Sequence, residues 1–428
     1  MQAFLAAIEV LASGNNGEPA AAGLLGQLGY DEGLPEEASH RAAMLRVAAG
    51  FTSLFSLPSP DASGLVALGA TAEPGVAVSG AGATFREAFE ACVGEGAEAL
   101  SLLAAPDQDY ERMTARDALA GRSQAFWTLW EGLRPYLRDP ASAESDWAWA
   151  ANLADGKAVL VPADLCLRRP ASTRQIDPPW PLSSGCAAAP DRAAATLLAL
   201  LELIERDAVA LWWGGGRRAR LLAADAAAPT EAGGLLRHLR GSATGRRTWL
   251  LDITSDLAVP TVVAVSCESD GQGICCGMAA RPTQAAAARR AVVEVCQMEV
   301  AVRLAQAKQA VGGDEGLSEA DRRHLRRFSE LHSDRCAAFT PTAPPAESCD
   351  IAADQPVAIL NAVRARLKAV GLEPCAIDLT RGEIGIPVVR VICPGLQPHP
   401  SSPPTPRLRA AIAAAGDPPV PFADVPVL

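Results

Sequence analysis

AAATLLALLELIERDAVALWW, residues 193–213, combines a long apolar run with a tight group of charged side chains. Apolar residues fall on nearly every side of a helical projection, which predicts a helix buried inside a domain. Glu202 and Glu205 are three positions apart and therefore lie on one face of that helix. Two carboxylates buried side by side need a cation or a proton between them. A lone ExxE pair is also common where a helix turn is exposed to water. Its interpretation therefore depends on the other motifs along the chain.

The composition is that of an ordinary globular chain. Its 428 residues are 49% hydrophobic and 20% charged, which predicts a large core and about two or three domains. The net charge of −11, without a basic tract, argues against a nucleic-acid surface. The N-terminus lacks the basic start of a signal peptide, and no apolar run approaches the length of a membrane span, so we expect a cytoplasmic protein. The 11 cysteines have no regular spacing and the 5 histidines are scattered, which favours core cysteines over a zinc site.

Two segments share the order strand, Ser-Gly loop, helix with an ExxE pair. SGAGAT at 79–84 leads into a predicted helix over 85–103, which carries Glu95 and Glu98. LSSGCAAAP at 182–190 leads into the central helix with Glu202 and Glu205. The loop glycine precedes the first glutamate by a similar distance, from 80 to 95 and from 185 to 202. We interpret this as an internal repeat.

A second repeat and a third polar helix follow. DITSDLAVPTVVAV at 252–265 and DLTRGEIGIPVVRV at 378–391 both run Asp, apolar, Thr, polar turn, Pro and a β-branched stretch. That pattern predicts a turn that feeds a buried strand. A helix predicted from about residue 283 carries Arg289, Arg290, Glu294 and Gln297.

Polar pairs on three apolar helices suggest a shared site. Carboxylates that converge in a core are suited to Mg²⁺, which usually keeps substrate phosphates as further ligands. Arg206 and Arg290 could hold those phosphates. No Walker A motif, kinase glycine loop or Rossmann fingerprint is present, so the site would belong to none of the common nucleotide folds. The alternative is that these glutamates pair with arginines in structural ion networks, and spacing alone does not decide between the two.

These segments, taken in order and together with RGEIGIPVVRVICPGL at 381–396, resemble the YcaO superfamily, whose enzymes use ATP to activate peptide backbone amides. The resemblance covers roughly residues 65–428. It implies an α/β fold of YcaO-like mixed sheets and helices with an internal repeat. Residues 1–62 would form a small helical N-terminal extension, and residues 63–428 a YcaO-like domain with a Pro-rich C-terminal tail.

The resemblance also implies a site with ATP and Mg²⁺. The metal ligands would be Glu95, Glu98, Glu202 and Glu205, and the nucleotide site would include Ser183, Ser184, Arg206, Arg290, Glu294 and Gln297. The tail would bring catalytic residues to the site, namely Pro421, Phe422, Pro426 and Leu428.

The chain departs from the family pattern inside this site. Ala81 stands where family members usually have lysine, Ser184 where they have asparagine, and Ala194 where a further acidic ligand is expected. Asp191 lies three residues before Ala194 and could replace that ligand if the loop is rearranged.

The function implied is ATP-dependent cyclodehydration of a ribosomally made precursor peptide, which forms azoline heterocycles. Two alternatives remain open: thioamide formation with an external sulfide, and a degenerate, non-catalytic partner subunit that binds peptide or a sister subunit. The expected partners are the precursor peptide, a separate leader-binding E1-like protein, a flavin dehydrogenase and a second copy of the chain. The leader-binding protein is expected because no recognisable leader-binding domain precedes residue 65. Neither nucleic acid nor a membrane is expected as a partner.

Overall fold

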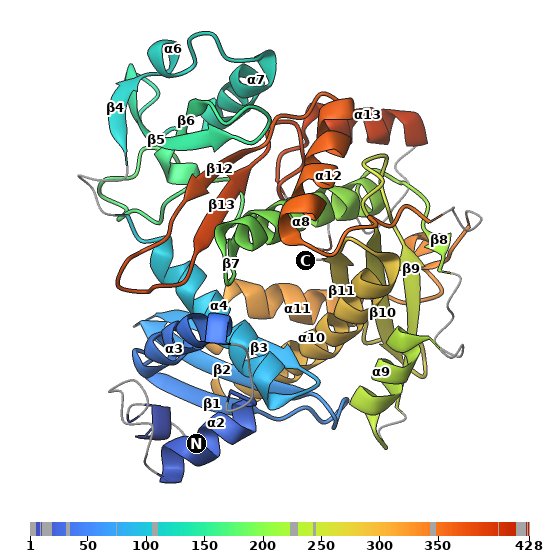
Figure 1. Cartoon of the computed structure of the whole chain (residues 1–428). Helices are drawn as coiled ribbons and strands as arrows, with labels where there is room; N and C mark the ends of the chain where they lie inside the picture. Colours follow the sequence, from blue (N-terminus) through green and yellow to red (C-terminus); the bar gives the residue numbers. More distant parts are fainter. Residues whose placement is uncertain are drawn as a thin grey trace.

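The computed structural model describes residues 6–8, 10, 19–30, 35–73, 75–104, 110–222, 230–242, 245–342, 348–400, 402–416, 425 and 427. In this part of the chain the architecture is mixed α/β, with three antiparallel sheets arranged around the long helix α8 (Figure 1). This confirms the predicted fold class. None of the described helices is long and apolar enough to cross a membrane.

The first sheet has the order β1–β2–β3, with β1 at Ser53–Leu57, β2 at Val66–Glu73 and β3 at Val76–Gly82. Helix α4 (Phe85–Ser101) packs on β3, and the N-terminal helices α2 (Pro19–Leu28) and α3 (Pro35–Ala49) contact α4. Strand β1 corrects the sequence analysis, which predicted only helices in this part of the N-terminal extension. Because β1 pairs with β2 along its whole length, it belongs to the first sheet. The domain division after residue 62 stays a prediction.

The second sheet has the order β11–β10–β9–β8 and is covered on both faces. Val262 and Ala264 of β10 pack in one apolar cluster with Val295 of α10, while Val263 and Val265 pack with the Trp212 end of α8. The alternation along β10 therefore places α10 and α8 on opposite faces. The elements are β8 (Arg220–Leu221), α9 (Glu231–Arg240), β9 (Arg246–Asp252), β10 (Thr261–Glu268), β11 (Cys275–Ala280), α10 (Gln284–Gly312) and α11 (Glu319–Glu330).

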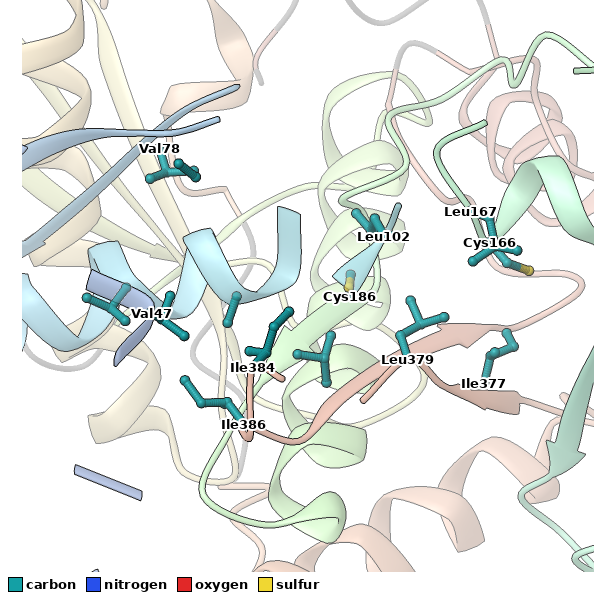
Figure 2. Packing of buried hydrophobic residues seen from close by; sticks show 14 of the residues in the cluster. Val47, Val78, Leu102, Cys166, Leu167, Cys186, Ile377, Leu379, Ile384 and Ile386 are labelled. Atoms are coloured by element: carbon teal, nitrogen blue, oxygen red, sulfur yellow. The ribbon is translucent and has the colours of Figure 1, made fainter. Parts of the chain in front are cut away.

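The third sheet combines strands from distant parts of the sequence in the order β4–β5–β12–β13–β7, and β6 also pairs with β5. The loop between β12 and β13 carries Ile384 and Ile386 to Val47 of α3, so that the third sheet is packed against the first layer (Figure 2). The strands are β4 (Glu111–Thr114), β5 (Glu144–Asn152), β6 (Ala158–Pro162), β7 (Cys186–Ala188), β12 (Cys375–Asp378) and β13 (Val388–Ile392). The helices beside this sheet are α6 (Ala115–Ala118), α7 (Gln124–Leu133), α8 (Arg192–Trp213), α12 (Pro356–Ala369) and α13 (Pro406–Ala415).

Helix α8 confirms the prediction from residues 193–213 to within one residue at its start. Its side chains contact the third sheet at the N-terminal end and the second sheet at the C-terminal end. A helix that is apolar nearly all round satisfies both neighbours. The same burial places Glu205, which is 6% exposed, in the interior.

The second sequence repeat is visible as two hairpins with the same hydrogen bonds. Oδ1 of Asp252 accepts the backbone N–H of Thr254 at 2.8 Å, and Oγ1 of Thr254 accepts N–H of Thr261 at 3.0 Å. In the other copy Asp378 accepts from Thr380 at 3.0 Å, and Thr380 accepts from Val388 at 3.2 Å. Where each pair of strands separates, these side chains accept backbone hydrogen bonds in place of the opposite strand. The sequence Asp-x-Thr therefore specifies the connection between β9 and β10 and that between β12 and β13.

Candidate active site

The first pair of carboxylates lies on α4 and is held by strand backbones. Oε2 of Glu95 accepts N–H of Ser79 in β3 at 3.0 Å, and Oε1 of Glu98 accepts N–H of Ala188 in β7 at 2.9 Å. Among the described residues, the other oxygen of each carboxylate has no hydrogen-bond donor. Each glutamate is therefore fixed in orientation with one oxygen still available.

The second pair lies on α8 and is held in the same way. Oε2 of Glu202 accepts N–H of Gly185 at 3.1 Å, and Oε2 of Glu205 accepts N–H of Ala280 at 3.2 Å. The remaining oxygens bind Arg206, at 3.0 Å for Glu202 and 2.8 Å for Glu205. One guanidinium thus occupies the position between the two carboxylates.

Helix α10 brings a third set of side chains to the same place. Gln297 donates to Oγ of Ser79 at 3.4 Å, which connects α10 with β3 beside Glu95. Arg290 acts electrostatically on Glu95, and Glu294 on Glu205, so both residues lie within reach of the two pairs. The predicted residues of α4, α8 and α10 are therefore brought together.

Arg281 belongs to this cluster and was not predicted. It directly follows β11, and its charge acts on Glu205. No motif singles it out in the sequence. The available signal is its position one residue after a buried strand and two residues before Thr283, the N-cap of α10.

The cluster lacks enough positive charge to ionise all its carboxylates. Loss of bulk water, together with neighbouring carboxylates, raises the pKa of Glu95 to about 7 and that of Glu98 well above its usual range. Burial likewise raises the pKa of Glu205 to about 7, although Arg206 opposes the shift. Glu95 keeps some exposed surface, and its pKa is raised because the surrounding protein atoms reduce the hydration of its carboxylate. When a cation binds nearby, its positive charge favours the ionised form of these carboxyl groups, which can then act as its ligands.

The carboxylate oxygens of the cluster are suitable ligands for Mg²⁺, but they do not surround one position at which the ion could bind. Carboxylate oxygens are the ligands that Mg²⁺ prefers. Within the described residues, however, no three or more His, Cys, Asp or Glu side chains are grouped closely enough to hold a metal ion. The salt bridges of Arg206 explain part of this arrangement, because they keep Glu202 and Glu205 on the guanidinium. Metal binding there would require Arg206 to turn away.

The Ser-Gly loop before β7 borders the carboxylates. Ser183 and Ser184 line a cavity of about 210 Å³ together with Arg206, Glu294 and Val427. Both serines therefore lie beside the charged cluster, and the prediction that their loop binds the nucleotide stays a prediction.

Of the three positions that depart from the family pattern, Ser184 lies beside the charges, whereas Ala81 and Ala194 pack in apolar clusters. Ala81 is 2% exposed and packs in the apolar cluster between β3, α9 and α10. Oδ1 of Asp191 accepts N–H of Ala194 at 2.9 Å and caps α8, so in this structure Asp191 serves the helix terminus. It does not replace the acidic ligand expected at position 194.

The predicted tail residues Pro421, Phe422, Pro426 and Leu428 lie outside the described residues. Two neighbours are described, Val425 and Val427, and both are buried. Trp213 donates to the carbonyl of Val425 at 3.1 Å, and Arg327 donates to that of Val427 at 2.8 Å. Val427 therefore lines the cavity that contains Ser183 and Arg206.

The sequence profile of one family matches residues 79–397, and that family is described as YcaO cyclodehydratase, ATP- and Mg²⁺-binding. An uncharacterised protein of Methanothermobacter thermautotrophicus is 29% identical over 269 residues, which are 60% of this chain and 66% of that protein. The match to the family confirms the predicted resemblance. ATP and Mg²⁺, the predicted cofactors, are those of the family.

Solved structures of the same kind share the fold. A heterocyclase in complex with substrate and cofactor has a TM-score of 0.65 and 22% identity, over 86% of this chain and 53% of that one. YcaO from Methanopyrus kandleri bound with AMPPCP and Mg²⁺ has a TM-score of 0.59 and 20% identity, over 86% and 92%. The E. coli microcin synthetase McbBCD complex with pro-MccB17 bound has a TM-score of 0.60 and 14% identity, over 81% and 88%. The chain spans about half the length of the heterocyclase.

Proposed function

The chain belongs to the YcaO family, and from this premise we propose that it uses ATP to activate a backbone amide of a ribosomally made precursor peptide, forming an azoline. A Cys, Ser or Thr side chain of the peptide would attack the preceding carbonyl carbon. The resulting oxyanion would take the γ-phosphoryl group of ATP. Loss of phosphate, with the amide nitrogen proton, would leave the C=N bond of the ring.

The observation that supports this proposal is the convergence of five glutamates from three helices. Among the described residues, the charges of Glu95, Glu98, Glu202, Glu205 and Glu294 interact with those of four arginines, Arg206, Arg281, Arg290 and Arg390, so the carboxylates outnumber the guanidinium groups. A structural ion network would balance its charges, whereas this one leaves carboxylates with raised pKa values. The imbalance favours a site for cations and phosphate.

Each group of residues would have its own task. Glu95 and Glu98 on one side, and Glu202 and Glu205 on the other, would hold Mg²⁺, which neutralises phosphate charge when bound. Arg206, released from its glutamates, and Arg290 would bind phosphate oxygens. Ser183, Ser184, Glu294 and Gln297 would orient the nucleotide so that its γ-phosphate meets the amide oxygen.

The partners follow from the same proposal. A precursor peptide is the substrate, and a separate leader-binding protein would present it. Oxidation of an azoline to the aromatic ring would need a flavin dehydrogenase, and the chain itself would act as a homodimer. Heterocyclase and microcin synthetase structures with substrate or pro-peptide bound support this kind of assembly in general.

A non-catalytic partner subunit is the second candidate. Ala194 offers no ligand, and Asp191 is engaged as the cap of α8. If Arg206 remains between Glu202 and Glu205, it takes the place of one cation permanently. Such a subunit would bind peptide or a sister subunit without ATP turnover.

Calorimetry with ATP decides between the two candidates. We expect ATP to bind in the presence of Mg²⁺ and to raise the melting temperature, because a ligand that binds only the native state stabilises it. Glu95→Gln and Glu202→Gln should fold and lose this binding, since each removes a ligand charge while keeping side-chain size. Glu90→Gln is the matched control on α4, because that carboxylate binds Tyr30 and Arg86. Absence of ATP binding with or without Mg²⁺ would establish the non-catalytic reading.

A further inference from the structure

A second, larger cavity adjoins the Ser-Gly loop and shares Ser184 with the smaller cavity described above. It measures about 600 Å³ and lies between α7, β13, the end of α12 and the segments 393–398 and 403–410. Its walls are mostly aliphatic, from residues such as Leu129, Leu203, Val391 and Leu396. Volumes of this size are typical of ligand sites, which are apolar with a few placed polar groups.

Arg390 is the polar group of this cavity that is most deeply buried. It is 1% exposed, and its guanidinium is held by backbone carbonyls. Nε donates to the carbonyl of Leu165 at 2.6 Å, and Nη1 donates to those of Leu182 and Ser184. Within the described residues Nη2 makes no hydrogen bond, and no carboxylate lies within 4.0 Å of the guanidinium.

Two other arginines line the cavity. Arg409 is exposed and donates to the backbone carbonyl of Pro404 at 2.6 Å, whereas Arg407 is paired with carboxylates. Arg407 binds Asp207 at 2.8 Å and also pairs with Asp256.

Arg390 therefore carries a buried charge that is hydrogen-bonded by carbonyls and has no salt bridge within the described residues, although the charge of Glu202 acts on it from beyond 4.0 Å. Burial lowers its pKa from the usual value. Burying an ion is costly unless an opposite charge accompanies it, so this arrangement points to an anionic group from outside.

The position of the cavity relates it to the proposed reaction. Ser184 lines both the large cavity and the smaller one that contains Arg206 and Glu294. Leu203, which lines the large cavity, lies between Glu202 and Glu205 on α8. A peptide with one amide at the phosphoryl-transfer site can therefore place a neighbouring residue in the large cavity.

We propose that this cavity is a substrate subsite for a peptide residue that combines an apolar body with a carboxylate, which pairs with Nη2 of Arg390. The proposal rests on the proposed function for the identity of the ligand as a peptide. The carboxylate has two sources, an acidic side chain or the C-terminus of the peptide. In either case the aliphatic walls select the apolar part and Arg390 selects the charge.

Short peptides test the charge directly on the full-length wild-type protein. Calorimetry without ATP or metal would compare N-acetyl-Gly-Ser-Leu with a free carboxylate, the same peptide as its C-terminal amide, and N-acetyl-Gly-Ser-Glu amide. We expect the carboxylate forms to bind about tenfold or more tightly than the leucine amide, as a charged hydrogen bond predicts. Preference for the first peptide identifies the C-terminus as the source, and preference for the third identifies an acidic side chain.

Two variants test the place of binding. Gly132→Phe on α7 introduces a side chain at a cavity-lining position where a Cβ meets no atom within 4 Å, and it should abolish peptide binding. Gly234→Phe, at an open position on α9 outside the cavity, is the matched control and should bind normally. Arg390→Met should reduce the carboxylate forms to the affinity of the amide.

The proposal is overturned if the acid and amide peptides bind equally, if none of the three binds, or if Gly132→Phe binds as well as Gly234→Phe. Because Arg390 also anchors three carbonyls, the acid–amide comparison on the wild-type protein keeps the test valid if Arg390→Met does not fold. The measurement is also separate from the ATP experiment. A protein that binds ATP with Mg²⁺ but not these peptides keeps the proposed function and loses the subsite.

Discussion

At the scale of single residues, the site is built on one repeated contact. Each glutamate of the two ExxE pairs accepts one backbone N–H, from Ser79, Ala188, Gly185 or Ala280. Such a bond fixes a carboxylate without neutralising it, so the negative charge stays available to a ligand. Salt bridges would have stabilised the same side chains more cheaply. Within the described residues Glu95 and Glu98 form no salt bridge, and the proposed cation site accounts for this arrangement.

Glu98 provides a test of this reasoning through the pH dependence of stability. Its pKa is raised well above 4.5 in the native state, mainly by burial, so the native state binds more protons than the unfolded chain. The contribution of Glu98 to the free energy of unfolding is therefore fully present below pH 4.5 and is lost as the pH rises through the native pKa of this residue. Glu98→Gln removes this loss. We expect the metal-free variant to exceed the wild type in melting temperature by more at pH 8 than at pH 5.

The control for this measurement is Glu90→Gln on the same helix, which should show the same difference from wild type at both values of pH. Addition of Mg²⁺ with ATP at pH 8 should reduce the advantage of Glu98→Gln, because the wild type alone gains the charge pair. An advantage of Glu98→Gln that is equal at pH 5 and pH 8 would show that the carboxylate is not strained in the native state.

At the scale of elements, two strand–helix contacts set the distance between the carboxylates. A Cβ on Gly80 in β3 would lie 2.2 Å from the backbone nitrogen of Cys92 in α4. A Cβ on Gly277 in β11 would lie 2.1 Å from that of Val295 in α10. Both strands thus run in direct contact with a helix backbone, and both helices carry site residues one turn or less from the contact. Glu95 and Glu294 are placed by these contacts.

Gly80→Ala should therefore damage both stability and the site. The added methyl group meets backbone atoms that cannot rotate away, so β3 and α4 must separate, at a cost of about 1–3 kcal/mol. Gly94→Ala is the matched control, since its Cβ meets nothing within 4 Å and alanine favours the helix by about 1 kcal/mol. Denaturant unfolding should show opposite signs for the two variants, and ATP binding should fall only for Gly80→Ala. A neutral Gly80→Ala would mean that the strand and helix are not rigidly coupled.

At the scale of the whole molecule, the sequence predicted the elements that carry their own pattern. Helix α8 follows from its periodicity, and the hairpins β9–β10 and β12–β13 follow from Asp-x-Thr and the β-branched runs. The order of strands in the third sheet does not follow in this way. It joins β5 to β12 and β13 to β7 across about half the chain, and no local property encodes such pairings.

The same distinction applies to the site. The sequence predicted the site glutamates because an ExxE pair places two charged side chains in a helix that is otherwise apolar and expected to be buried. These residues are Glu95, Glu98, Glu202 and Glu205. Arg281 and Arg390 were not, because an arginine after or within a strand is unremarkable until its neighbours are known. Strand β1 was missed for a related reason. Its sequence SLFSL is short and ambiguous, and its strand conformation depends on pairing with β2.

The C-terminus connects the sequence prediction with the site, and it carries the last prediction. Deletion of residues 421–428 removes Val425 and Val427, whose carbonyls accept hydrogen bonds from Trp213 and Arg327. Since each valine is buried, the deletion should lower stability by about 1.5–3 kcal/mol per valine. The carboxylates of α4 and α8 keep all their contacts, so binding of ATP with Mg²⁺ should persist. Peptide modification should be lost, because the deletion removes Pro421, Phe422, Pro426 and Leu428, the tail residues predicted to act in catalysis.

Val427→Ala separates the two effects of the deletion. It removes packing but keeps the backbone carbonyl on Arg327, so it should share part of the stability loss while modification continues. The measurements are denaturant unfolding, calorimetry with ATP and Mg²⁺, and mass spectrometry of the peptide for the loss of one water. A truncated protein that modifies the peptide at the full rate would show that the tail contributes only apolar packing against the second sheet. Failure of a truncated protein that remains folded to bind ATP would instead indicate that residues 421–428 contribute to the nucleotide site.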